Sequence, residues 1–183
     1  MRTTDIHIID NGVLLTRSFE EALEFHRGNA YWGCALAFRM LQYAAQLLSS
    51  EKTWERQDLT IESGHPGPGV RDTIEYVTGC VSAGRFQLTC TTGETRCVSD
   101  MDYSWRVNDG KQYLKLRLAD GIVSSEFLQL LDIINRNEAN EHHYERLESL
   151  KKAMTENIWS LDLDQAFPDA RLIRSLTGPK ACR

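Results

Sequence analysis

Residues 31–48 read YWGCALAFRMLQYAAQLL, and this stretch decides the fold. Its long polar side chains, Arg39, Gln42 and Gln46, fall three and four residues apart and form one narrow stripe, while apolar side chains cover most of the remaining circumference. A helix that is apolar nearly all round has to be surrounded by other elements. The stretch also falls short of a membrane span, which needs about 20 predominantly apolar residues. We therefore predict a long buried helix at the centre of the fold, and no membrane partner.

The length of the chain bears on how that helix is covered. The chain has 183 residues, of which 42% are hydrophobic, and this is enough for one main domain with a real core. Such a chain has limited material to wrap a helix on every side. We therefore predict a homodimer in which the second copy completes the cover.

Charge and cysteine usage narrow the class of protein. The 26 acidic and 21 basic side chains give a formal net charge of −5, and the cations are scattered along the sequence, so we expect no nucleic-acid partner. Residues 1–7 lack the apolar core of a signal peptide, which predicts a cytoplasmic protein. Five cysteines without a CxxC pair argue against a disulfide framework or a zinc ribbon.

Start, stop and turn signals around the central stretch predict the other elements. Ser18 and Glu21 have the spacing of a capping box, and Gly79 is suited to a left-handed helix end. Asn108-Asp109-Gly110 lies between two alternating segments, which is typical of a hairpin. In chain order we expect a helix over about 18–27, the buried helix over 31–48, a strand over 58–62, a Gly/Pro-rich loop over 63–69, a helix over 70–77, a strand over 86–90, and a hairpin over 103–118.

The last third of the sequence has the period of amphipathic helices. Phe127 and Ile134 share one helix face, and so do Tyr144 and Ile158 further along. The tail after Ser160 carries too weak a pattern for any element. We predict an α+β fold in which an antiparallel sheet packs with the buried helix, as an intertwined dimer. Residues 1–122 form its core, and 123–183 form a helical segment packed on or extending that core.

Imidazole and thiol groups in three segments carry the candidate chemistry. His26 follows Phe25 just before the long helix, His65 lies in the Gly/Pro-rich loop, and Cys80 follows Thr78-Gly79. These side chains bind transition metals, or act as base and nucleophile near neutral pH.

Two of these segments resemble the FmdE-like domain family, which takes its name from a component of formylmethanofuran dehydrogenase. The first runs from Phe25-His26 through Gly28 and Tyr31-Trp32-Gly33-Cys34 into the long helix. The second comprises Glu62, then Gly69-Val70-Arg71-Asp72, then Thr78-Gly79-Cys80. The second His and the Cys-Pro of the family's first signature are replaced here by Gly28, Ala30 and Trp32, and the turn cysteine of its second signature is absent. The resemblance implies an intertwined α+β dimer with a His/Cys-lined cleft that holds a zinc-type metal ion or a small ligand, in association with C1 or redox metabolism.

Three interpretations of this cleft stay open. In the first, His26, His65 and Cys80 bind zinc or another divalent transition metal, with Glu62 as a base or a partner of a ligand. In the second, the site is metal-free: Cys80 is a reactive thiol activated by a histidine, or Phe25, Tyr31 and Trp32 line a pocket for a planar ligand. In the third, all of these residues are structural. The sequence leaves open whether the protein is an enzyme and which residues would be catalytic.

Overall fold

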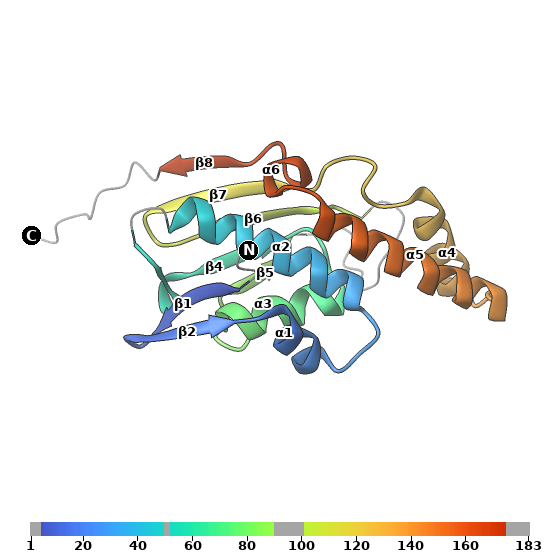
Figure 1. Cartoon of the computed structure of the whole chain (residues 1–183), viewed down its shortest axis with the longest axis horizontal. Coiled ribbons are helices and arrows are strands. Elements are labelled where there is room, and N and C mark those ends of the chain that lie inside the picture. The colour runs from blue at the N-terminus through green and yellow to red at the C-terminus, as the bar shows by residue number, and fades with distance from the viewer. Residues whose placement is uncertain (1–4, 50–51, 90–100, 175–183) are drawn as a thin grey trace, which may run out of the picture.

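The computed structural model describes residues 5–49, 52–89 and 101–174, which form a mixed α+β fold (Figure 1). The helices are α1 (Phe19–His26), α2 (Tyr31–Leu48), the 3-10 helix η1 (Arg56–Asp58), α3 (Pro68–Thr78), α4 (Ser125–Asn135), α5 (Glu141–Ser160) and α6 (Leu163–Ala166). The strands are β1 (Ile6–Asp10), β2 (Val13–Arg17), β3 (Trp54–Glu55), β4 (Thr60–Ser63), β5 (Phe86–Leu88), β6 (Ser104–Asn108), β7 (Gln112–Arg117) and β8 (Arg171–Arg174).

Helix α2 lies at the centre of the molecule and has the predicted bounds. Twelve of its eighteen residues are buried, including Phe38, Met40 and Leu41 with no exposed surface. Helices α1, α3, α5 and α6 pack around it together with strands β1 and β7 of the same chain. Since one chain covers α2, its burial does not require a second copy. The homodimer stays a prediction, but the need to cover α2 no longer supports it.

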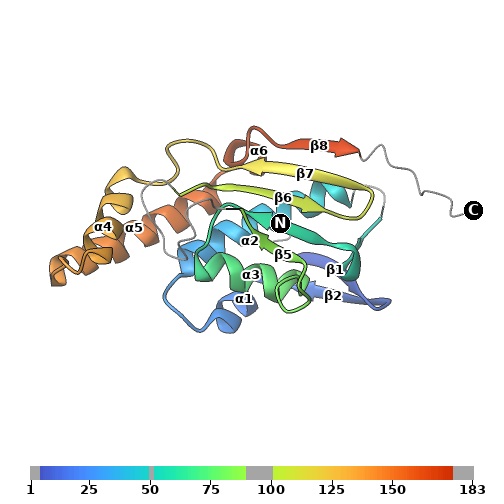
Figure 2. The same ribbon diagram turned by 180° about the vertical axis from the view of Figure 1, so that it is seen from behind.

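Five strands form the larger sheet, in the order β5-β4-β6-β7-β8, with all pairs antiparallel except β4 with β5. The predicted hairpin is confirmed, since β6 and β7 pair across the turn at Asp109-Gly110. Alternation along β6 buries Trp105 and Val107 on the face toward α2 and leaves Arg106 on the other face. Figure 2 looks onto this second face.

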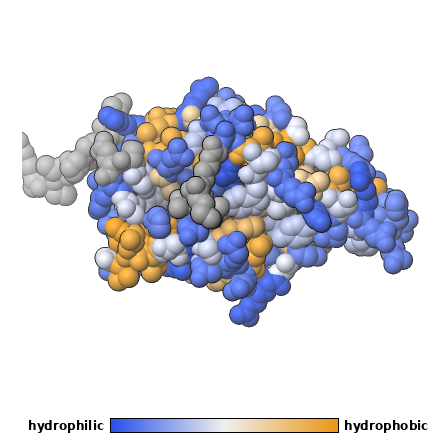
Figure 3. All heavy atoms as spheres, viewed as in Figure 1, coloured by the Kyte–Doolittle hydropathy of each residue, from blue (hydrophilic) through white to orange (hydrophobic). Residues whose placement is uncertain are grey.

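A smaller sheet, in the order β2-β1-β3, was not expected from the sequence. Strands β1 and β2 join through Asn11 and Gly12, whose φ angles of 50° and 81° suit a tight hairpin turn. This Asn-Gly pair between apolar residues was an available hairpin signal. Beyond the turn, Val13 and Leu14 are 60% and 61% exposed, and an orange patch lies over this hairpin at the lower left of Figure 3.

The C-terminal elements share the core of the first part of the chain. The predicted helices α4 and α5 are present, whereas α6 and β8 follow the point at which the sequence pattern becomes too weak to interpret. Strand β8 pairs with β7, and one continuous hydrophobic cluster runs from Ile6 to Phe167. Within the described residues, no helix is both long enough and apolar enough to cross a membrane.

Candidate functional site

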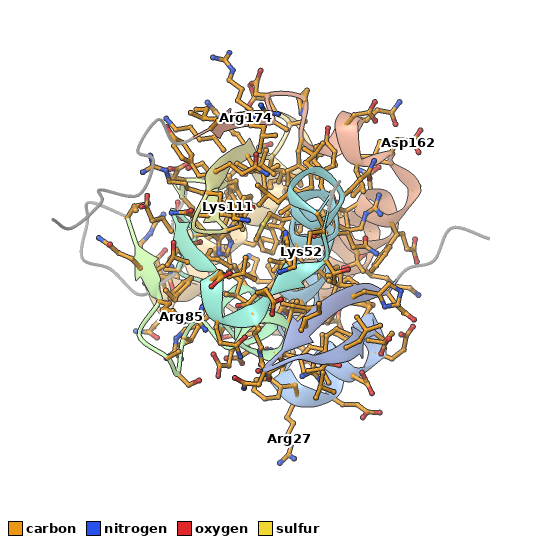
Figure 4. The ribbon with its side chains drawn as sticks, turned by 90° about the vertical axis from the view of Figure 1, so that its left-hand side faces the viewer. Arg27, Lys52, Arg85, Lys111, Asp162 and Arg174 are labelled. Atoms are coloured by element: carbon orange, nitrogen blue, oxygen red, sulfur yellow. The ribbon has the colours of Figure 1, made fainter. Side chains whose placement is uncertain are left out.

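His26 is positioned by the end of α1. The predicted capping box is present, with Ser18 accepting from the backbone of Glu21, and the helix stops at Arg27, which has a left-handed φ of 53°. The turn sends neighbouring side chains in opposite directions. Arg27 extends away from the body of the protein in Figure 4, whereas the His26 side chain is only 6% exposed.

A hydrogen-bonded pair links His26 to Asp72 on α3. Nδ1 of His26 lies 2.7 Å from Oδ2 of Asp72, and the backbone N–H of Ala30 donates to Nε2 of His26 over 3.2 Å. Because Nε2 accepts a hydrogen bond, we assign the ring proton to Nδ1, where it donates to the carboxylate. Asp72 orients the imidazole, and the side chain of this aspartate is 31% exposed. We call this pair, with the loop from Arg27 to Ala30, the His26–Asp72 site.

Close packing of α2 against α3 brings Asp72 to this position. Gly69 lies against the start of α2, where a Cβ atom would be 2.3 Å from the carbonyl oxygen of Ala30 and 2.9 Å from the backbone nitrogen of Cys34. Gly33 faces the backbone of Val70 from the other helix. Without side chains at these two glycines, the helix backbones approach closely. The start of α3 is thereby fixed beside the end of α1.

Cys34 is fully buried at the start of α2, where its sulfur lies against Gly69 of α3. Burial raises the pKa of its thiol to about 11, and the Asp72 carboxylate also acts to raise it, against a lowering effect of the Thr73 hydroxyl. The thiol is therefore protonated near neutral pH. A protonated buried thiol is neither a nucleophile nor a metal ligand.

His65 is buried in the loop before α3. Its Nδ1 accepts from the backbone N–H of Gly67 at 2.9 Å, and its backbone is held at both ends by the Ser63 hydroxyl. Its ring packs edge-on against Tyr103, with centroids 5.0 Å apart. Burial lowers the pKa of His65 to about 4, so the ring is neutral at physiological pH. These contacts hold the loop in shape.

Cys80 lies at the other end of α3 from the His26–Asp72 site. It follows Asp72 by eight positions, and the helical part of that stretch, from Asp72 to Thr78, spans roughly 9 Å. Its Sγ donates to the carbonyl of Leu59 at 3.3 Å, just after the left-handed helix end at Gly79 that the sequence predicts. Burial raises the pKa of Cys80, the opposite of what a reactive thiol requires.

The four predicted ligand-binding residues have separate environments. Phe25 is 49% exposed and packs against Tyr76, and Trp32 is buried in the core. The hydroxyl of Tyr31 donates to the carbonyl of Glu148 on α5. Glu62 lies on the outer face of the sheet, 3.4 Å from Arg106. The structure does not gather them into one aromatic pocket.

Most donor atoms of the proposed metal ligands already have protein partners. The two nitrogens of His26 contact Asp72 and Ala30, Nδ1 of His65 contacts Gly67, and the sulfur of Cys80 contacts Leu59. Among the residues that the structure describes, no three His, Cys, Asp or Glu side chains form a group that could hold a metal ion. Within one chain, His26, His65 and Cys80 thus do not form a preformed zinc site.

Comparison with known proteins adds no family assignment. Neither the models of protein families nor the curated proteins searched contain a match to this chain. The FmdE-like resemblance therefore rests on the two sequence segments described above.

Sequence reasoning gave no role to Asp72 or Cys34. The signal for Asp72 was its place in the Gly-Val-Arg-Asp segment at the start of α3, inside the family-like motif. For Cys34 and Gly69 there was no such signal, since their contact depends on how two helices cross.

Proposed function

We propose that this chain is a divergent FmdE-like protein that binds a small hydroxyl- or acid-bearing molecule at the His26–Asp72 site, without requiring a metal ion. The observation that carries the proposal is the 2.7 Å contact between Nδ1 of His26 and Asp72. This contact presents Nε2 of the imidazole as a hydrogen-bond acceptor of fixed orientation.

The surroundings of Nε2 support a ligand with a polar group. In this structure Nε2 accepts only a 3.2 Å hydrogen bond from the Ala30 amide, at the boundary of α2. The start of α2 has no side-chain cap, and uncapped helix amides favour polar or anionic groups. A ligand hydroxyl could therefore donate to Nε2 while an attached carboxylate accepts from the amides of α2.

Access to Nε2 depends on the loop between α1 and α2. Arg27, Gly28 and Asn29 are exposed, and Gly28 lies directly over the imidazole. A modest displacement of this loop would uncover Nε2 while the contact between His26 and Asp72 persists. Binding and loop displacement are then coupled.

The test is an NMR titration of the histidine rings with short hydroxy acids, from glycolate to citrate, on protein purified without a His-tag. We expect saturable shifts of the His26 resonances. Affinity should fall about tenfold or more in Asp72→Asn, because one charge-assisted hydrogen bond is worth about 1.5–3 kcal/mol. His142→Ala is the matched control, since the His142 side chain is 83% exposed and distant in sequence from the pair.

Two results would overturn the proposal. One is a set of His26 resonances that no hydroxy acid shifts. The other is near-stoichiometric zinc in the purified protein that is lost in His26→Ala, which would establish the metal interpretation instead.

A further inference from the structure

We propose that the outer face of the five-stranded sheet binds a small molecule carrying two or more adjacent anionic groups, of the phosphate or carboxylate kind. Four cations define this basic sheet face: Arg106 on β6, Lys115 and Arg117 on β7, and Arg171 on β8. It shares no residue with the His26–Asp72 site, and the two proposals stand or fall separately.

The strand register brings together cations that are far apart in the sequence. Arg106 lies directly opposite Lys115, and Lys115 lies directly opposite Arg171. Side chains opposite each other in antiparallel strands have Cβ atoms about 5 Å apart. Three cations therefore form one row across three strands, and Arg117 follows two residues beyond Lys115 on the same face.

The positive charge of this row is only partly compensated. Glu62 lies opposite Arg106 and pairs with it at 3.4 Å, and Arg117 reaches the highly exposed Asp120 at 3.5 Å. Within the described part of the chain, the side chains of Lys115 and Arg171 form no ion pair or hydrogen bond. Like charges directly opposite each other in a sheet are destabilising. An anion between them would relieve that repulsion.

The same residues line a hollow of a suitable size. Its volume is about 550 Å³, which is within the range of small-molecule sites, and Glu62, Asp169, Thr89 and Ser104 also contribute to its wall. With four cations against the two carboxylates, the hollow favours an anion even though the whole chain is acidic. This local excess of cations is what a polyanionic ligand would recognise.

The shape of the face favours a small molecule over a nucleic-acid strand. Single strands bind where bases can stack on exposed aromatic rings beside a basic groove. The Tyr113 ring on this face is covered by the guanidinium of Arg106, 4.0 Å from the ring centroid. Trp105 also borders the hollow, but its side chain is buried on the opposite face of the sheet and the residue is 3% exposed. Neither ring offers a stacking surface.

The test is a titration followed by backbone amide NMR in low-salt buffer, with inorganic diphosphate and citrate as probes and acetate as the single-anion comparison. We expect saturable shifts on β6, β7 and β8 for diphosphate or citrate. Tighter binding of diphosphate would identify the preferred group as phosphate, and tighter binding of citrate would identify it as carboxylate. Arg171→Ala should weaken binding about tenfold, and Lys115→Ala with Arg171→Ala should abolish it. Lys111→Ala and Arg136→Ala are the matched controls. Each removes an exposed cation outside the basic sheet face and should leave binding unchanged.

Three outcomes would overturn the inference. Shifts that stay linear with concentration, or an equal loss of affinity in the Lys111 and Arg136 controls, would mean that the cations only keep the sheet soluble. Tighter binding of a single-stranded oligonucleotide than of either probe would make the face a nucleic-acid surface. The substituted side chains are exposed, so thermal unfolding of each variant should show that its fold is intact.

Discussion

At the residue scale, Gly28 sets the position of the His26 imidazole. A Cβ atom at Gly28 would lie 2.6 Å from Nε2 of His26, which is closer than non-bonded atoms can approach. The ring would have to move, and the 2.7 Å contact with Asp72 constrains where it can go. A single methyl group at this position should therefore disturb the pair directly.

We predict that Gly28→Ala shifts the ring resonances of His26 and weakens any hydroxy-acid binding about tenfold or more, while the free energy of unfolding falls by only about 1 kcal/mol. Histidine NMR and chemical denaturation measure the two effects. Gly84→Ala is the control for a loss of stability alone: its left-handed φ of 67° makes an added Cβ atom unfavourable, but that atom has nothing within 4 Å, so the His26 resonances should stay unchanged. Unchanged His26 resonances in Gly28→Ala would contradict this interpretation of the site.

Buried His65 should make stability depend on pH. The pKa of His65 is about 4 in the folded protein, compared with the ordinary value of 6.5. The unfolded chain therefore takes up a proton first as the pH falls, and stability is lost from about pH 6.5 down to about pH 4. We predict that this group alone lowers the free energy of unfolding by about 2 kcal/mol between pH 7 and pH 5.

Denaturation at several pH values in the native protein and in His65→Gln isolates this contribution, since the variant should lack it. Should His65→Gln fail to fold, direct NMR titration of the His65 ring in the native protein serves the same purpose. A ring that titrates near pH 6.5 would show that the histidine is not buried as described.

At the element scale, Arg39 fastens α5 to α2. The guanidinium, on a residue that is 9% exposed, donates to the carbonyls of Ile158 and Leu161 at 3.2 and 2.5 Å and also to Gln42. These carbonyls belong to the end of α5, where a helix presents partial negative charge. The guanidinium of Arg39 also lies 5.3 Å from the centroid of the Trp159 ring. Arg39, one member of the polar stripe of the central helix, is thus a docking contact for α5.

We predict that Arg39→Met lowers the free energy of unfolding by about 2–3 kcal/mol, because buried carbonyls lose a charged donor while the apolar stem is retained. Arg136→Met, which alters an arginine 63% exposed, should change it by less than about 0.5 kcal/mol. Chemical denaturation distinguishes the two. Equal effects in both variants would mean that the contacts of Arg39 contribute nothing to stability.

At the scale of the whole molecule, the described residues on either side of residue 122 share one core. Ile158 and Phe167 belong to the same hydrophobic cluster as Phe38 in α2, and β8 completes the sheet beside β7. We predict that heating unfolds the protein in one transition, with coincident far-UV and near-UV circular dichroism curves. Two separated transitions would show that 123–183 is an independent unit.

The sequence predicted the elements whose patterns are local. The period of residues 31–48, the Ser18–Glu21 capping box and the Asn108-Asp109-Gly110 turn each depend on neighbours in the chain, and α2, α1 and the β6–β7 hairpin follow them. Strand β8 and helix α6 were missed because short exposed segments carry little periodicity. Their place depends on pairing with β7 and packing on α2.

The two proposed sites depend on tertiary structure more than the individual helices and strands do. The sequence by itself determined that a buried α2 would be surrounded by amphipathic elements, and that His26 would stand just before it. Only the folded chain decided that His26 meets Asp72 rather than Cys80, and that Arg106, Lys115 and Arg171 form one row. The physical reason is that helix and strand periods act between residues near in sequence, whereas a site forms where helix crossing and strand register bring distant residues together.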